Sequence, residues 1–243
     1  MNKDEIIEIA EKSRAARVEW RGRGRAPMGY VKGLALSYAR AHEKLLAGHS
    51  GMTLVARGDT FDDSHDALSW YRSRFRAMKL SNRVAGPDVL RNSFVLLMGL
   101  GMRESSGKYC EGRDRSAGNR GGMTCEAGMF QTSWNISLFS TEIVKLLTEY
   151  EDENVEGFIS TYREGVSCSA MDLKNYGIGA GLKYQTLAKL KPDFAVEVAL
   201  IGLRVARRHW GPLNTHAAEL RREALDLFNA VRETLAPPKE PEV

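Results

Sequence analysis

The chain has 243 residues, of which 43% are hydrophobic and 27% are charged, an ordinary balance for a globular protein. It contains no run of 18 or more apolar residues, which argues against a membrane-spanning helix. The formal net charge of +4 suits anionic partners such as cell-wall polymers, nucleic acid or lipid head groups, and it suits solubility alone equally well.

The first third of the chain has the periodicity of helices. Residues 3–19 carry one apolar face behind Asn2, a suitable N-cap residue, and are predicted to form the first helix. Glycine-containing loops and two further helices are predicted over residues 21–27, 30–47, 48–62 and 63–79. We assign residues 1–85 to an N-terminal helical extension.

The next predicted helix is the most informative element. It starts at Gly86-Pro87-Asp88, because proline is favoured in the first helical turn and an acidic residue suits that end. Residues 89–102 are apolar on all sides, as in a helix buried in a core. The helix runs directly into Glu104, so it should deliver an acidic side chain at its C-terminal end.

The composition changes after this helix. Residues 107–128 contain six glycines and few aliphatic residues, which predicts turns and a small β-hairpin. Helices are predicted again over residues 139–150, 154–164, 192–210 and 215–235, with a glycine-rich turn at 174–181. The proline-rich tail, residues 236–243, is predicted to be disordered.

The three cysteines, Cys110, Cys125 and Cys168, allow two interpretations. An odd number without a recognisable leader favours reduced thiols, with Cys168 buried in the core. Alternatively, Cys110 and Cys125 flank the glycine-rich segment, and a disulfide between them would stabilise it by roughly 3 kcal/mol in the chain-entropy model. Both interpretations are kept, because spacing does not show the geometry that a disulfide needs.

Glu104 is the strongest candidate for chemistry. At the C-terminal end of a buried helix, burial and the helix dipole both disfavour a carboxylate, so the pKa of Glu104 should be raised. A general acid that cleaves a glycosidic bond needs a raised pKa, because it must hold a proton near neutral pH. Taken alone, a glutamate that caps a turn or pairs with Arg103 is the simpler interpretation.

Two motifs change that balance. Residues 103–107 read Arg-Glu-Ser-Ser-Gly, and residues 126–135 contain Gly-Met-Phe-Gln at 128–131. At this spacing the pair resembles the goose-type lysozyme and soluble lytic transglycosylase superfamily, which carries an E-S motif at the end of a central helix and a later G-L-M-Q motif. The turn around Tyr176 resembles the A-Y-N element of the same superfamily. The resemblance covers residues 88–210.

The resemblance implies a mainly α, lysozyme-like α+β fold with a buried central helix, a small β or turn-rich lobe and the N-terminal extension. Residues 86–235 would be a lysozyme-like catalytic domain that cleaves β-1,4 bonds of peptidoglycan, as a glycoside hydrolase or lytic transglycosylase. Glu104 would be the general acid. Ser105 would position the sugar or the acid, Gln131 would hydrogen-bond the substrate, and Tyr176 would lie near the acid.

The correspondence breaks at three positions. Ser133 stands where the goose-type family has an aspartate, Gly177 stands where the A-Y-N element has asparagine, and Glu126 is an additional acid. An inverting hydrolase needs a second carboxylate as its base. The candidates in the glycine-rich segment are Glu111, Asp114 and Glu126. Glu126 is preferred and Asp114 is second, although Asp114 could instead pair with its neighbouring arginines. Without such a base, a transglycosylase that uses one glutamate becomes the better interpretation.

Several residues could contact the glycan. Tyr109, Trp134 and Tyr184 are candidate platforms for sugar rings, with core packing as the alternative for each. Asn135, at the end of the second motif, is a further candidate for substrate binding. The substrate itself is expected to be peptidoglycan first and a chitosan-like amino-sugar polymer second.

Other functions have weaker support. The sequence contains no HExxH, CxxC or GxxxxGK pattern, so we expect neither a metal nor an organic cofactor. Ser133 motivates the alternative of a non-catalytic glycan-binding or structural module. Nucleic acid is not expected as a partner, because only the arginine tract at 21–25 and the mild positive net charge point to it. No signal peptide is visible, although action at the cell wall or outside the cell is expected.

Overall fold

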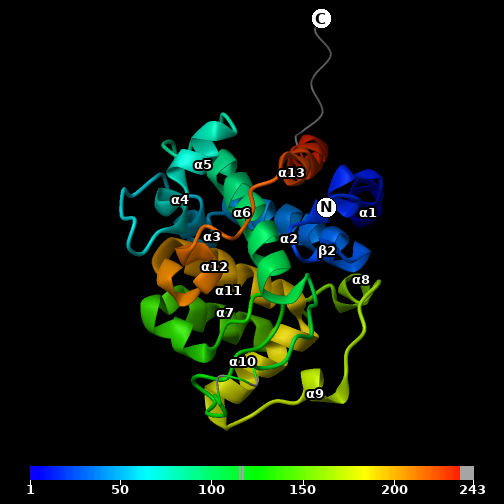
Figure 1. Ribbon diagram of the computed structural model, residues 1–243, viewed down its shortest axis with the longest axis vertical. Coiled ribbons are helices and arrows are strands. Elements are labelled where there is room, and N and C mark those ends of the chain that lie inside the picture. Colours follow the sequence, from blue (N-terminus) through cyan, green and yellow to red (C-terminus); the bar gives the residue numbers. More distant parts are fainter. Residues whose placement is uncertain (115, 117, 236–243) are drawn as a thin grey trace, which may run out of the picture.

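The computed structural model describes residues 1–114, 116 and 118–235, and this part of the chain is mainly helical, which confirms the mainly α class (Figure 1). The predicted disordered tail, 236–243, lies outside the described residues. The helices are α1 (Lys3–Lys12), α2 (Met28–Leu46), α3 (Ser50–Val55), α4 (Ala67–Trp70), α5 (Arg72–Ala77), α6 (Pro87–Ser105), α7 (Thr141–Glu151), α8 (Ile159–Tyr162), α9 (Ala170–Leu173), α10 (Gly179–Leu190), α11 (Pro192–Val205), α12 (Gly211–Asn214) and α13 (Arg222–Leu235). Short 3-10 helices lie at Arg14–Ala16, Trp134–Phe139 and Arg207–His209.

Helix α6 is the predicted central helix. Pro87 occupies its first turn, and the side chains of residues 89–102 are buried. Ser106 and Gly107 adopt left-handed backbone angles, φ 56° and 78°, and their N–H groups donate to carbonyls of the last helical turn. The chain therefore turns away directly after Glu104. The prediction that a buried helix delivers Glu104 at its end is confirmed.

The N-terminal helices share the same core. The Tyr30 hydroxyl on α2 donates to the carbonyl of Met98 on α6 at 2.9 Å. A Cβ at Gly101 would lie 2.2 Å from the Tyr30 hydroxyl, so glycine is required where the two helices cross. One hydrophobic cluster extends from Ile6 to Val231. Residues 1–85, the expected extension, thus help to hold the end of α6 that carries Glu104.

The β-structure differs from the sequence expectation. Strands β1 (Glu19–Trp20) and β2 (Gly24–Arg25) form an antiparallel hairpin that starts at the last residue of the predicted helix 3–19 and crosses the predicted loop 21–27. Helix α1 ends at Lys12, so the prediction of helix up to residue 19 was wrong. Within residues 107–128, leaving out 115 and 117, the structure contains no strand, and only a single bridge joins Ala127 to Thr132. The small hairpin expected at 107–128 was therefore wrong for these residues. Side-chain hydrogen bonds and ion pairs, such as those of Gln131 and Lys108, hold this segment where a strand ladder was expected.

Several helix boundaries also differ. The predicted helix 63–79 is divided into α4 and α5, and the predicted loop 48–62 contains α3, whose Met52 and Val55 are buried. Helix α10 starts inside the predicted glycine-rich turn at 174–181. Tertiary packing overrides local propensity in such short elements.

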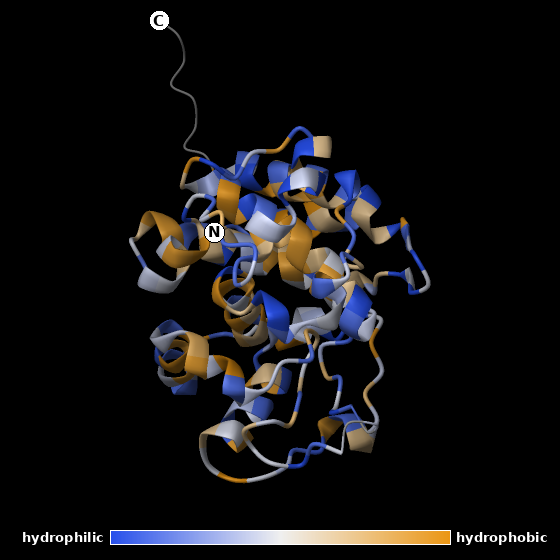
Figure 2. Cartoon of the chain, turned by 60° about the vertical axis from the view of Figure 1, so that its left-hand side comes forward, coloured by the Kyte–Doolittle hydropathy of each residue, from blue (hydrophilic) through white to orange (hydrophobic). Residues whose placement is uncertain are grey.

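The arrangement places different elements at the two ends of α6. In Figure 1, α4 and α5 lie beside its start, and α9 and α10 lie beyond its C-terminal end. Apolar residues gather inside the helical body, and the outer turns are mostly hydrophilic (Figure 2). In the part of the chain that the structure describes, no helix combines the length and apolar character needed to cross a bilayer.

Candidate active site

Glu104 lies half-buried in the last turn of α6. Burial raises the pKa of its carboxyl group to about 7, and the negative charge of Glu126 acts in the same direction, whereas Arg23 and Arg103 oppose the shift. Among the described residues, none forms a hydrogen bond or ion pair with this carboxyl group. The group is therefore protonated over much of the range below neutral pH, and no described residue accepts its proton in a hydrogen bond.

Arg103, which the sequence suggests as an ion-pair partner of Glu104, forms its hydrogen bond with another residue. Its guanidinium donates to the carbonyl of Arg21 in the turn of the N-terminal hairpin, at 3.3 Å. The same turn carries Arg23, whose charge reaches Glu104. The hairpin thus forms part of the electrostatic surroundings of the acid, a role that no local motif indicated.

Ser105 connects the two motifs. Its hydroxyl donates to the carbonyl of Met129 at 2.8 Å and accepts the N–H of Lys108 at 3.1 Å. The side chain is only 8% exposed. These contacts fasten the end of α6 to the loop at 128–131, so Ser105 acts on the position of the acid rather than offering a free hydroxyl to a sugar.

Glu126 occupies the segment that enters this loop. It is half-buried, and the N–H of Asp114 donates to its carboxylate at 3.4 Å. Burial and the charge of Asp114 raise the pKa of Glu126. The structure therefore brings Glu104, Glu126 and Asp114 into one electrostatic group, in which each carboxylate acts on the next.

Asp114 itself is exposed and is not held by the side chain of Arg113. Its carboxylate accepts hydrogen bonds from the N–H and hydroxyl of Ser116 at 2.8 and 2.7 Å. Arg113 donates to the main-chain carbonyl of Asp114 instead. Arg115, the other neighbouring arginine, lies outside the described residues.

Gln131 and Asn135 hold the loop in shape. The Gln131 backbone is left-handed, φ 46°, and its side-chain amide donates to the carbonyls of Gly112 and Gly128 at 3.0 and 3.1 Å. The Asn135 side-chain oxygen accepts the hydroxyl of Ser133 at 2.8 Å. Ser133, which stands where the goose-type family has an aspartate, is thus used within the loop.

The aromatic candidates divide into buried and accessible residues. Tyr109 and Trp134 are 5% and 7% exposed, and Trp134 packs against Tyr184 in the core at 5.8 Å between ring centroids. Tyr176 is half-exposed, with Arg113 over its ring at 5.2 Å. It lines a hollow of about 300 Å³ together with Glu111, Gly112, Arg113, Asp114, Met171 and Asp172. Tyr176 is therefore the accessible platform of this set, although Glu104 does not line that hollow.

The disulfide joins Cys110 to Cys168, with Cα atoms 6.1 Å apart, and Cys125 is a buried free thiol. The suggested bridge from Cys110 to Cys125 and the suggested free thiol at Cys168 were both wrong. Residues 58 positions apart come together because the chain folds back beside the site, which spacing along the glycine-rich segment does not reveal.

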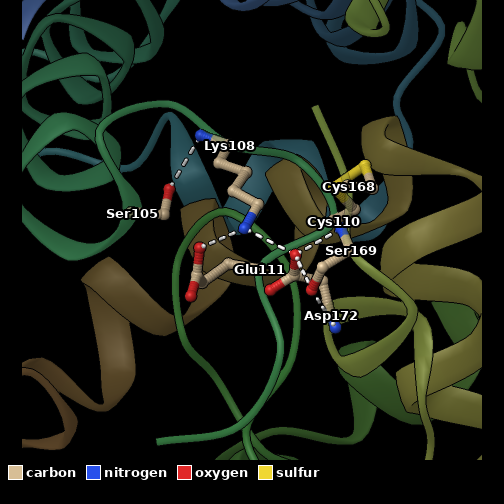
Figure 3. Close-up of a disulfide and its surroundings, with 7 residues drawn as sticks. All are labelled: Ser105, Lys108, Cys110, Glu111, Cys168, Ser169 and Asp172. Atoms are coloured by element: carbon tan, nitrogen blue, oxygen red, sulfur yellow. Dashed lines mark hydrogen bonds and ion pairs between the residues drawn. A yellow bond between two sulfur atoms is a disulfide. The ribbon is translucent and has the colours of Figure 1, made fainter. Parts of the chain in front are cut away.

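An ion-pair cluster reinforces this covalent link (Figure 3). The Lys108 ammonium lies 3.2 Å from the Glu111 carboxylate and 2.8 Å from that of Asp172. Asp172 also accepts the N–H and hydroxyl of Ser169. The cluster ties the segment around α9, which carries Tyr176, to residues 108–114. Lys108 and Asp172 were not identified from the sequence. The closeness of Lys108 to Glu104 in the chain could have suggested Lys108, but no signal in the sequence indicated Asp172.

No group of three or more His, Cys, Asp or Glu side chains that could hold a metal ion occurs in the described part of the chain. The carboxyl group of Glu104 has a raised pKa and lies in the electrostatic field of a second carboxylate, Glu126. Comparison with protein-family models, curated proteins and solved structures gives no significant match.

Proposed function

We propose that this chain is a glycosidase of the lysozyme or lytic transglycosylase type, which cleaves β-1,4 bonds of an amino-sugar polysaccharide, with peptidoglycan as the first substrate. The observation that carries the proposal is the carboxyl group of Glu104, which has a pKa of about 7 and no hydrogen-bond partner among the described residues. A general acid needs both properties, because its proton must be present at neutral pH and free to reach the leaving oxygen.

In this proposal Glu104 protonates the glycosidic oxygen as the bond to the sugar breaks. Glu126 is the second carboxylate, and in its ionised form its charge holds the proton on Glu104. It would either activate a water molecule or stabilise the positive charge on the sugar. Tyr176 has a half-exposed ring in the hollow that Asp114 also lines. The buried central helix and the two motifs joined through Ser105 support a lysozyme-like fold.

The test is whether the protein releases soluble fragments from purified peptidoglycan. The loss of turbidity measures the rate of release, and mass spectrometry identifies the products. We expect the wild type to release fragments and Glu104→Gln to lose at least about a hundredfold in rate. Glu151→Gln, an exposed α7 glutamate paired with Lys183, is the matched control and should keep wild-type activity. Products with a hydrated reducing end indicate hydrolysis, and anhydro-sugar ends indicate transglycosylation.

Chitosan is the second substrate to assay, because the sequence also favours a related amino-sugar polymer. If the wild type releases nothing from either polysaccharide, the enzymatic proposal is contradicted. Binding to peptidoglycan without release would then favour a non-catalytic glycan-binding module, the alternative that Ser133 motivates.

A further inference from the structure

A second polar hollow lies beside the start of α6, at the opposite end of that helix from Glu104. It has a volume of about 220 Å³ and is bounded by α5 and the segment that follows it. Its lining residues are Asp59, Arg72, Phe75, Arg76, Leu80, Ser81, Asn82 and Arg83. Asn92 and Glu104 are 12 residues apart in α6, a separation of about 18 Å along the helix axis. The hollow is therefore separate from the candidate active site.

The charge of this hollow is positive. Residues 72–83 contain four arginines and a lysine and no acidic residue. Asp59 is the acidic residue in the lining, and it is bound by Arg72, whose Nε lies 2.7 Å from its carboxylate. Burial opposes ionisation of Asp59, but hydrogen bonds led by that of Arg72 lower its pKa to about 2, so one charge of each sign cancels.

Arg76 and Arg83 supply the remaining charge. Both are exposed, and neither forms an ion pair with a carboxylate in the described part of the chain. Two guanidinium groups therefore line one concave site with their donors available. Guanidinium forks match the oxygen atoms of phosphate and carboxylate groups in geometry as well as in charge.

Asn82 provides a second, independent observation. This side chain is 6% exposed and lines the hollow. Arg91 donates to the Asn92 side-chain oxygen, which fixes the Asn92 amide nitrogen as the donor to the Asn82 side-chain oxygen at 2.7 Å. The nitrogen of the Asn82 amide has no acceptor among the described residues. The Asn82 side chain is thus held in place by Asn92, and its amide nitrogen is able to donate to an anion at the wall of this cationic hollow.

We infer that this hollow is a binding site for a phosphoryl-type oxyanion. Arg76 and Arg83 would neutralise its charge, and the Asn82 amide and the Ser81 hydroxyl would donate to its remaining oxygen atoms. The site does not depend on the proposed glycosidase activity, because it shares no residue with the Glu104 site. The anion can come from a phosphate monoester or from a phosphodiester, and the experiment separates these two sources.

The probe is inorganic phosphate, titrated into the full-length protein at constant ionic strength set with chloride, with backbone amide NMR shifts as the readout. We expect saturable shifts at Ser81, Asn82 and Arg83. Arg76→Gln and Arg83→Gln should each weaken phosphate binding by about tenfold, the loss of one charge-assisted contact. Arg74→Gln, which removes an exposed charge from the same helix but not from the lining, is the matched control and should change affinity less than about twofold.

Two results would overturn the inference: shifts that do not saturate, or an Arg74→Gln variant that loses as much affinity as Arg76→Gln. Either would mean diffuse surface attraction instead of a site. Dimethyl phosphate, titrated in the same way, identifies the source. Binding as tight as that of inorganic phosphate supports a phosphodiester ligand, and much weaker binding supports a monoester. None of these readouts requires glycan cleavage, so failure here leaves the glycosidase proposal standing.

Discussion

Glu104 and Glu197 both have carboxyl groups with a raised pKa, and the surroundings of the two groups differ. Glu197 on α11 is 1% exposed, and burial together with the charge of Asp193 raises its pKa. Its oxygens are bound by the Lys44 ammonium at 2.6 and 2.7 Å and by the Tyr150 hydroxyl at 2.9 Å. Glu104 has no such partner among the described residues.

A raised pKa alone does not identify a catalytic carboxyl group. Burial raises the pKa of both groups, so the shift by itself reports desolvation. The ion-pair cluster around Glu197 satisfies its carboxyl group and links α2, α7 and α11. The proton of Glu104 has no acceptor among the residues that the structure describes, and such an unengaged proton is the property expected of the proposed catalytic acid.

Removing the partner of Glu197 should have the largest effect. Lys44→Met leaves the buried Glu197 carboxylate without its cation, and we expect a loss of about 4 kcal/mol in the free energy of unfolding at pH 8. The loss should be smaller at pH 5, because a protonated Glu197 does not need the cation. Urea unfolding measures both values.

Lys145→Met is the matched control for that variant. Lys145 pairs with Glu142 on the surface of α7, and its removal should cost less than about 1 kcal/mol. Equal losses in the two variants would show that the Glu197 cluster is no more important for stability than a surface ion pair.

At the candidate site, the Cys110–Cys168 disulfide holds the segment around α9 in place. Replacing both Cys110 and Cys168 by serine releases the segment around α9, and we expect a loss of about 4 kcal/mol in the free energy of unfolding. Hydrogen exchange should increase mainly over residues 166–177. Cys125→Ala leaves the bond intact and is the control. Unchanged exchange over 166–177 would mean that the Lys108–Asp172 ion pair suffices to hold the segment.

Glu104→Gln should stabilise the protein at alkaline pH. The unfolded carboxyl group ionises near pH 4.5, whereas the folded one keeps its proton to about pH 7. Between these values the folded state binds more protons, so wild-type stability falls as pH rises. We expect the variant to be more stable by about 2 kcal/mol at pH 8, allowing for partial exposure, and equal to the wild type at pH 4.

Glu197→Gln sharpens the same comparison. It removes the buried charge but also the charged acceptor for Lys44, so the stabilisation at pH 8 should be smaller than that of Glu104→Gln. Thermal unfolding at pH 4 and pH 8 checks both variants. Stabilisation of the two variants by the same amount would show that the partners of Glu197 do not offset its burial.

The smallest expected effect comes from the N-terminal hairpin. Arg23 lowers the pKa of Glu104, so Arg23→Gln should raise that pKa by a few tenths of a unit. The alkaline limb of the pH–rate profile, where the acid loses its proton, should move upward by the same amount. Arg25→Gln in the same hairpin is the control. A downward shift for Arg23→Gln would contradict the electrostatic role of the hairpin.

The course of α6 could be predicted because its signals are local. Pro87 in the first turn and the apolar residues on all sides of the segment 89–102 specify a buried helix without reference to the rest of the chain. The same reasoning failed at α3 and α10, which are short or begin in glycine-rich sequence. Their formation depends on neighbours that cover their apolar side chains.

The sequence by itself determined the mainly α class, the buried central helix and the position of Glu104 at its end, because capping and hydrophobic periodicity act between residues a few positions apart. The tertiary structure alone decided that Cys168 pairs with Cys110, that Ser105 binds the Met129 carbonyl, and that Arg23 and Glu126 act on Glu104. These contacts join segments far apart in the chain, and hydrogen bonds, disulfides and charge interactions depend on distances in space that residue spacing does not encode.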